Sequence, residues 1–222
     1  PDVVITQAQC EVCAVSLKDV EEALSTMVHK QAEIISLQPD TLSAILNDIK
    51  QIALTLDREK EGAELLEDLE TRIEIVQHKV KHVQQRSKVA CIEWIEPLMV
   101  AGNWTPELIM IAGGMPVLAE NGKHSPFINW EQLAASAPDI LVIAPCGFSI
   151  PRTLSEIHLL TEHPLWKELP AVQKNSVYVA DGNHYFNRSG PRIVDSIEIL
   201  AEIIQANQFY FGMEGEAWVK FG

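Results

Sequence analysis

Short runs of β-branched and aliphatic residues alternate with amphipathic helical stretches, and this alternation constrains the fold more than any other feature of the chain. Most of the runs are nearly continuous in Val, Ile, Leu and Ala, as expected for strands that are covered on both faces. The predicted strands occupy residues 3–6, 33–37, 89–95, 140–144 and 177–180. The pattern therefore predicts an α/β protein with a mainly parallel sheet.

Helices are predicted between these strands from their apolar spacing and their end signals. Asp40 or Thr41 can cap a helix that follows the second strand. Thr105 as N-cap and Pro106 at the first helical position predict another helix, which the glycines at 113–114 would end. The remaining helices are predicted at residues 16–29, 130–136 and 191–206.

The segment 58–82 is the most charged and the most regular part of the chain, and it predicts one long helix. Its apolar residues recur alternately three and four apart and form a narrow seam. One interpretation is a spine helix that lays this seam across the protein's own body, with its acidic residues in water. The other is a two-stranded coiled coil that would make the protein a dimer, although the seam covers only about two and a half heptads. The seam residues are Leu66, Leu69, Ile73, Val76, Val80 and Val83.

The composition changes after this helix, because Trp94, Trp104, Trp130 and Trp166 lie beyond it, as do most of the Gly and Pro residues. We therefore place a boundary near residue 86. The sequence predicts an amino-terminal lobe at residues 1–57, a spine helix at residues 58–85 and a carboxy-terminal lobe at residues 86–222.

Charge and composition exclude several classes of protein. The chain carries 17 Lys and Arg against 31 Asp and Glu, a formal charge of −14, which repels nucleic-acid backbones and anionic lipid surfaces. Its 47% hydrophobic content is too high for a disordered protein. The apolar runs are far shorter than the roughly 20 residues of a membrane helix. The chain opens at Pro1 without a leader, so we expect an internal start that says nothing about the compartment.

The loops that follow the predicted strands hold the candidate binding residues, because ligands of open α/β sheets bind beyond the carboxyl ends of the strands. Aromatic rings, amides and guanidinium groups gather there, as a large, partly apolar ligand with amide or acidic groups requires. The candidates are Gln7, Cys10 and Cys13 after the first strand, Trp94, Glu96 and Trp104 after the third, Phe148 after the fourth, and His184, Tyr185, Phe186 and Arg192 after the fifth.

Cys10 and Cys13 form a C-x-x-C pair directly after a strand, which is also the arrangement of thiol redox proteins. The carboxylate of Glu11 between them disfavours a reactive thiolate. A structural zinc site would need Cys91, Cys146 or a distant His as further ligands. A thiol redox or metal-handling protein is therefore the alternative function. No nucleophile, base and orienting group occur in a known catalytic spacing, so we expect that the protein is not an enzyme.

Several segments resemble the periplasmic substrate-binding proteins of cobalamin and iron-siderophore ABC importers, of the helical-backbone, TroA-like class. The opening P-D-V-V-I at residues 1–5 is similar to the family's P-D-L-V-I strand. The segment 129–143 matches its helix-then-strand signature, E-x-L followed by S-P-D and a hydrophobic run, with A-P-D in this chain. The segment 189–192, S-G-P-R, is similar to its S-x-P-R element. The order and spacing of these motifs cover nearly the whole chain.

The resemblance implies specific roles for five residues. Trp94 falls where the family places an aromatic residue against the ligand, and Tyr185 and Phe186 fall on its aromatic pair before the last helix. Arg192 falls on its ligand-side arginine. Glu131 falls on the carboxylate that docks onto arginines of the membrane permease.

The resemblance also implies the fold and the function. It implies two Rossmann-like lobes with parallel sheets joined by the long spine helix, with the first lobe incomplete because the family's first strands and helices have no counterpart before Pro1. The implied function is that of a monomeric solute-binding protein of the periplasm or cell envelope that needs no intrinsic cofactor, with the cytoplasm as the alternative location. Cobalamin, a corrinoid precursor, haem and a ferric siderophore are all open as ligands, and an ABC transporter permease is the implied partner. The better-known members of the family have no C-x-x-C pair at this position, so the identity of the ligand is left open.

Overall fold

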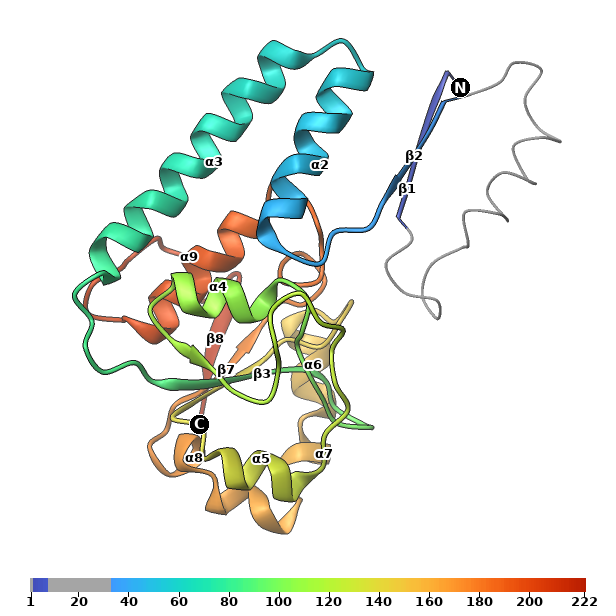
Figure 1. Ribbon diagram of the computed structural model, residues 1–222. Helices are drawn as coiled ribbons and strands as arrows, with labels where there is room; N and C mark the ends of the chain where they lie inside the picture. The colour runs from blue at the N-terminus through green and yellow to red at the C-terminus, as the bar shows by residue number, and fades with distance from the viewer. Residues whose placement is uncertain (1, 8–32) are drawn as a thin grey trace, which may run out of the picture.

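The computed structural model describes residues 2–7 and 33–222, so the predicted helix at 16–29 lies outside the described residues. Its central element is a six-stranded sheet in the carboxy-terminal part of the chain (Figure 1). The strand order is β4-β3-β6-β7-β8, with β5 paired to β3. These strands are β3 (Lys88–Trp94), β4 (Met99–Val100), β5 (Met115–Pro116), β6 (Ile140–Ile143), β7 (Val177–Ala180) and β8 (Trp218–Phe221).

The middle of this sheet is parallel, as the sequence predicts. Strand β6 pairs in parallel with both β3 and β7, with Val89 opposite Ile140 and Leu141 opposite Val177. The strands β4 and β8 are antiparallel and lie at the edges. The sequence analysis did not predict these two strands or β5, because they are short and their pairing depends on distant partners.

Helices cover both faces of the sheet, which makes this part a three-layer α/β structure (Figure 1). Val89 and Cys91 of β3 face a core that they share with α3 (Glu59–Val80), α4 (Thr105–Ile111) and α9 (Ile193–Ile204). Ala90 and Ile92 face the opposite core, which includes residues of α5 and α8. The helices around this second core are α5 (Trp130–Ser136), α6 (Ile150–Glu156), α7 (His158–Thr161), η1 (Pro164–Glu168) and α8 (Pro170–Gln173).

The helices α2, α4 and α5 begin within one residue of their predicted positions. Thr41 caps α2 (Leu42–Thr55), and its hydroxyl accepts a hydrogen bond from the Ala44 N–H at 3.3 Å. The predicted N-cap of α4 is wrong by one residue: Thr105 is already helical and Trp104 occupies the cap position without a side-chain bond. Helix α5 begins and ends as predicted and has a capping box built by Asn129 and Gln132.

Helices α2 and α3 form a long antiparallel hairpin that extends away from the sheet (Figure 1). Gly62 permits their close approach, because a Cβ atom at that position would lie 2.4 Å from the Cβ of Ala53. The hairpin thus gives α3 a partner over its first half, before its second half reaches α4 and α9.

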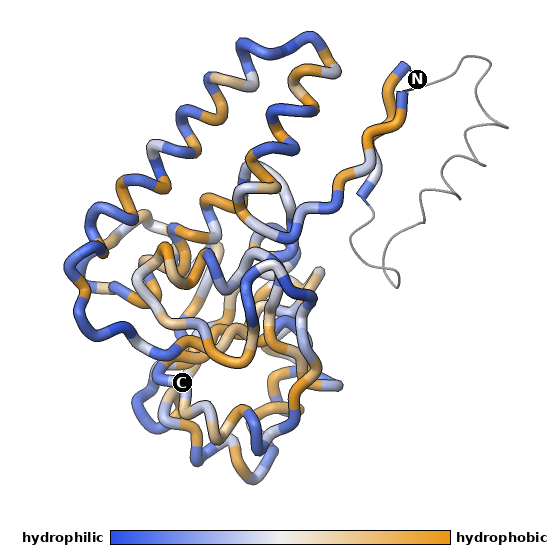
Figure 2. The backbone as a smooth tube through the Cα atoms, viewed as in Figure 1, coloured by the Kyte–Doolittle hydropathy of each residue, from blue (hydrophilic) through white to orange (hydrophobic). Residues whose placement is uncertain are grey.

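The apolar seam of α3 is buried against the protein's own body, which confirms the spine interpretation. Leu69, Ile73, Val76 and Val80 belong to the core of the molecule, and the acidic residues between Glu61 and Glu74 are exposed. Figure 2 shows these hydrophobic positions recurring along a mainly hydrophilic helix. Since the chain itself covers the seam, it is not available for a coiled-coil partner.

A second, smaller sheet lies apart from the main one. Strands β1 (Val3–Gln7) and β2 (Glu33–Leu37) pair in parallel, and β2 leads into α2 (Figure 1). The predicted segment boundaries fall in the connections before and after α3, and the separation into two lobes at these points stays a prediction. No helix in the described parts of the chain is long and apolar enough to cross a membrane.

Candidate ligand-binding site

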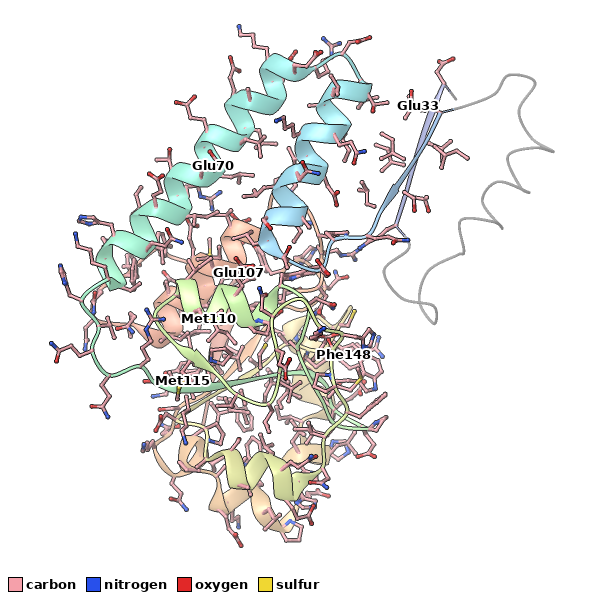
Figure 3. All side chains as sticks on the ribbon, viewed as in Figure 1. Glu33, Glu70, Glu107, Met110, Met115 and Phe148 are labelled. Atoms are coloured by element: carbon pink, nitrogen blue, oxygen red, sulfur yellow. The ribbon has the colours of Figure 1, made fainter. Side chains whose placement is uncertain are left out.

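The loops that follow the parallel strands meet at one edge of the main sheet. The N–H of Gly147, after β6, donates to the carbonyl of Gly182, after β7, at 3.2 Å. The N–H of Asn183 donates in turn to the carbonyl of Phe148 at 3.1 Å. Figure 3 shows Phe148 at this edge. Met115 of β5, which pairs with Lys88 at the amino end of β3, lies at the opposite edge. The structure thus brings the predicted loops together.

Trp94 and Phe148 form the aromatic part of the site. Trp94 ends β3 and is half-buried, and its indole N–H donates to the carbonyl of Glu96 at 3.0 Å. Its ring meets the ring of Phe148 edge to face, with centroids 5.3 Å apart. The guanidinium carbon of Arg152 lies 3.7 Å from the centroid of the Phe148 ring. Phe148 itself is buried, so it supports Trp94 and Arg152 from behind rather than offering a free face.

The loop after β7 is organised around the buried carboxylate of Asp181. Its Oδ1 accepts hydrogen bonds from the N–H groups of Asn183 and His184 at 2.9 and 2.8 Å. Its Oδ2 lies 3.2 Å from Nδ1 of His184, whose ring is exposed. The side chain of Asn187 donates to the carbonyl of Ala144 at 3.2 Å, which ties the loop to the end of β6. This network holds the loop in one shape at the edge of the sheet.

Tyr185 and Phe186 both pack against the core beneath α3, α4 and α9, but to different depths. Tyr185 is half-buried, and desolvation together with the charge of Asp195 raises the pKa of its hydroxyl. Phe186 is 2% exposed and has a φ of 58°. Its N–H donates to Oγ of Ser196 at 2.9 Å, which fixes the loop to the first turns of α9.

Trp104 and Phe186 are core residues, which differs from their predicted contact with a ligand. Trp104 is 4% exposed, and its indole N–H donates to the carbonyl of Phe186 at 2.7 Å. Both side chains belong to the core beneath α3, α4 and α9. They hold the site loops together from inside, and their position offers no face to a ligand.

Gln7 brings the amino-terminal sheet to the same edge. Its side-chain N–H donates to Oγ of Ser189 at 2.9 Å, so the end of β1 contacts the loop between β7 and α9. The contact joins residues 182 positions apart in the chain. The end of β1 and the loop after β7 therefore meet.

The remaining predicted residues are exposed. Glu96 lies beyond β3, and Arg192 occupies the N-cap of α9. Glu131 lies in the first turn of α5 and is exposed, so its predicted role in permease docking stays a prediction. Cys10 and Cys13 lie outside the described residues. Among the residues that the structure describes, no group of three or more His, Cys, Asp or Glu side chains is arranged to hold a metal ion.

Glu93 is a partly buried carboxyl group on β3, next to Trp94, that sequence analysis missed. Its Oε2 accepts a hydrogen bond from Oγ of Ser125 at 2.7 Å, and this Oγ accepts from the N–H of Gly102 at 3.0 Å. Burial raises the pKa of Glu93, while the Ser125 hydroxyl, the charge of His124 and the Gly102 N–H partly offset this. Through Ser125, the carboxyl group of Glu93 thus links β3 to the backbone at Gly102, two residues before Trp104.

We expect Glu93→Gln to stabilise the protein at neutral pH and to leave its stability nearly unchanged at acid pH. Because the pKa of Glu93 is raised in the folded state, its contribution to stability is complete below the unfolded value of about 4.3 and is lost as the pH rises through the folded value. Glutamine keeps an acceptor for Ser125 without the charge. Urea midpoints at about pH 3.5 and pH 7.5 measure the difference, and a variant that gains nothing at the higher pH would contradict it.

Arg152 and Asp181 are further site residues that the sequence analysis did not select. Arg152 lies on α6 rather than in a loop, so the search for residues directly after strands passed over it. Asp181 directly follows β7, and a lone Asp before a Gly is also the signal of an ordinary turn. The position of Arg152 one turn beyond Phe148 is the signal that could have identified it.

A polar groove at the opposite edge of the sheet does not coincide with these residues. It has a volume of about 490 Å³ and lies at the amino ends of the strands, where Ser87, Asp139 and Ser176 line it. Lys174 in its wall is 2.7 Å from Asp139 and neutralises its carboxylate. Gln85, Arg86 and Tyr178 line the groove as well. The predicted binding residues after β3, β6 and β7 lie at the other edge, which is the edge that ligands of such sheets use.

Comparison with known proteins identifies a family and a fold. Residues 1–183 match the model of a family described as periplasmic binding protein. A vitamin B12-binding protein of Vibrio cholerae serotype O1 is 20% identical over 185 residues, which cover 79% of this chain. The match spans 60% of the length of that relative.

Solved structures are similar over nearly the whole chain. An ABC transporter substrate-binding protein from Listeria monocytogenes has a TM-score of 0.76 at 20% identity, over 93% of this chain and 78% of that one. A periplasmic haem-binding protein from Pseudomonas aeruginosa has a TM-score of 0.74 at 18% identity, over 94% and 73%. The vitamin B12-binding protein of Vibrio cholerae has a TM-score of 0.69 at 18% identity, over 94% and 75%. At this identity the structures establish the fold.

Proposed function

The chain belongs to the periplasmic binding protein family, and on that premise we propose that it is a non-enzymatic solute-binding protein of the cell envelope. In this proposal it acts as a monomer and captures cobalamin, a related corrinoid or an iron-bearing chelate between its two parts. It then delivers this ligand to an ABC importer.

The observation that carries the proposal is the meeting of four segments at one edge of the sheet. The loops after β3, β6 and β7 contact one another through Trp94, Phe148 and Asn183, and the end of β1 reaches them through Gln7. A ligand seated at this edge would contact both the amino-terminal sheet and the carboxy-terminal part. Such a location between two units is where solute-binding sites form.

The class of ligand is supported by the aromatic residues and by the relatives. Trp94 and Tyr185 are half-buried, so each keeps part of its ring surface accessible. Relatives of this chain bind vitamin B12 and haem, and another similar structure is an Fe³⁺-hydroxamate transport protein of Saccharomonospora viridis. All of these ligands carry a metal ion, and the macrocycles of haem and vitamin B12 present faces that aromatic rings can cover.

The proposal assigns roles to the exposed residues as well. His184, Arg192 and Glu96 are placed to contact polar groups at the periphery of the ligand, and Gln7 contributes from the end of β1. Trp104 and Phe186 support the site from the core. Glu131 is exposed on α5, where an arginine of a permease could pair with it.

We expect Trp94→Ala and Tyr185→Ala each to weaken ligand binding by about ten- to a hundred-fold, because each removes a ring that covers the ligand. Absorbance and calorimetric titrations with cobalamin, cobinamide, haem and a ferric hydroxamate measure the affinity. The chain should be tested together with any upstream residues of its natural protein.

Trp130→Ala is the matched control. Trp130 stacks on His163 with ring centroids 4.1 Å apart, on the α5 side of the sheet and away from the site, so its loss should leave the affinity unchanged. Absence of micromolar or tighter binding of all four ligands would overturn the proposed function. Binding that survives in both site variants would overturn the proposed site.

A further inference from the structure

Glu93 lies at an irregularity of β3, directly before Trp94. Strand β3 advances by two residues, from Ile92 to Trp94, where its partner β4 advances by one, so Glu93 is the extra residue of a β-bulge. Such a bulge re-aims a side chain and is frequent beside functional sites. The carbonyl of Glu93 accepts a hydrogen bond from the N–H of Cys146 at 3.0 Å, so this residue also joins the ends of β3 and β6.

A chain of contacts runs from the carboxylate of Glu93 to the loop after β7. Oε2 of Glu93 accepts from Oγ of Ser125 at 2.7 Å, and this Oγ accepts from the N–H of Gly102 at 3.0 Å. Two residues further along, the indole N–H of Trp104 donates to the carbonyl of Phe186 at 2.7 Å. The carboxylate is therefore the anchor of a connection between the end of β3 and the loop after β7.

The backbone segments joined by this connection are closely packed. Ser125 is 3% exposed. A Cβ atom at Gly102 would lie 2.5 Å from the carbonyl oxygen of Lys123 and 2.7 Å from the backbone nitrogen of Ser125. The N–H of Asn103 donates to the same carbonyl at 2.6 Å. Because close-packed segments transmit small displacements, a change in the bond between Glu93 and Ser125 should reach the backbone at Gly102.

Among the described residues, His124 and Cys91 are the ionisable side chains that interact with the charge of Glu93. His124, in the segment after β5, favours the carboxylate. Burial and the charge of Glu93 raise the pKa of Cys91 on the same strand, so Cys91 stays a neutral thiol. Cys146, after β6, meets Glu93 through its backbone N–H. Glu93 is thus the group whose charge can change within this connection.

The hydrogen bond from Ser125 differs between the two protonation states of Glu93. A carboxylate accepts a charge-assisted bond, which is about twice as strong as the bond that a neutral carboxyl group accepts. Burial raises the pKa of Glu93, and the donors of Ser125 and Gly102 lower it in part. Anything that tightens these two donors on the carboxylate therefore disfavours its protonation, and protonation loosens the connection in return.

We infer that Glu93 is a positioning residue of the ligand site, whose carboxylate fixes the segments beside Trp94 and whose protonation weakens ligand binding. The inference rests on the proposed function and adds a regulation of the same site. A ligand that orders these segments tightens the two donors, so it binds the ionised form better and its binding releases a proton. The affinity should therefore rise with pH until Glu93 is ionised in the free protein. Because burial raises the pKa of Glu93, this rise should extend to a higher pH than for an ordinary glutamate.

The pH dependence of binding tests this inference, with cyanocobalamin, haem and a ferric hydroxamate as probes. Affinities of wild type and variant are compared at each pH between about 5 and 8, so that any titration of the ligand itself cancels. Glu93→Gln should bind about five-fold more weakly than wild type at about pH 8, and the difference should shrink towards none at about pH 5. Ser125→Ala, which removes the donor, should behave in the same way. Since Glu93→Gln is expected to stabilise the fold at neutral pH, weaker binding there would not come from unfolding.

Glu107→Gln is the matched control, because Glu107 is a half-buried carboxylate of α4 that accepts from the N–H of Leu42 at 3.1 Å, at the start of α2. It should bind like wild type at every pH. His124→Gln should keep the pH dependence of wild type. A loss in Glu93→Gln that does not shrink as the pH is lowered, or a pH dependence that disappears in His124→Gln, would overturn the inference and leave the proposed function standing. Failure of wild type to bind any of the three probes would overturn both.

Discussion

Lysine in place of Val76 is expected to lower the free energy of unfolding by about 3–5 kcal/mol, because it places a charge without a partner in the core. Val76 is 0% exposed and lies on α3 where the helix packs against α4 and α9. Since α9 follows the loop after β7, a damaged contact between α3 and α9 should also disturb that loop and the candidate site.

Ile75→Lys is the matched control, because Ile75 is the preceding residue of the same helix and is 48% exposed. Its replacement should change the free energy of unfolding by less than about 0.5 kcal/mol. Urea denaturation followed by circular dichroism measures both variants under the same conditions. Equal midpoints for the two lysine variants would show that the seam of α3 does not face the core.

The parts of the fold that sequence analysis predicts are those whose signal is local. Strands β3, β6 and β7 are continuous apolar runs because both of their faces are covered, and they appear within one residue of their predicted positions. The seam of α3 repeats over several turns, which predicts the helix itself, but the choice between a spine helix and a coiled coil needed the structure, in which the seam lies in the core. Strand β8, residues 218–221, carries no comparable signal, because it becomes a strand only by pairing with β7.

The candidate site is predictable as a set of loops and less so as a set of side chains. The rule that ligands bind at carboxyl ends of strands selects Trp94 and Tyr185, which are half-buried at this edge, and their contact with a ligand stays a prediction. The same rule selects Trp104 and Phe186, whose rings turn into the core. An aromatic residue in a loop can face either way, and the direction depends on tertiary contacts such as the bond from the Trp104 indole to the Phe186 carbonyl.

Helix α9 shows a further limit of sequence patterns. The spacing of its apolar residues predicts an amphipathic helix with its charged residues in water. Glu198 and Glu202 of this helix are nevertheless buried. Glu202 accepts hydrogen bonds from the N–H groups of Phe211 and Gly212 and from the indole N–H of Trp218. Glu198 binds Arg72 on α3 through both of its oxygens. Distant parts of the chain supply all these partners, so only the folded structure reveals why charged residues are tolerated there.

Arg72→Met is expected to lower the free energy of unfolding by about 2–4 kcal/mol, because it leaves Glu198 buried without its counter-charge. Arg72 lies 2.6 Å from Asp195 and 2.6 Å from Glu198, and hydrogen bonding to Glu198 raises the pKa of Arg72 further above its usual range. Arg58→Met is the control: Arg58 and Glu61 are both exposed and 3.5 Å apart, so its replacement should cost no more than about 0.5 kcal/mol.

The double variant Arg72→Met with Glu198→Leu separates the two causes of this loss. If the loss comes from an unpaired buried charge, removal of that charge should restore much of the stability, since apolar side chains can replace a buried ion pair at little cost. A double-mutant cycle from urea unfolding gives the coupling between the two positions. Additive losses in the double variant would instead mean that Arg72 and Glu198 act independently. The ion pair would then not hold α3 against α9 and the loop after β7 that precedes it.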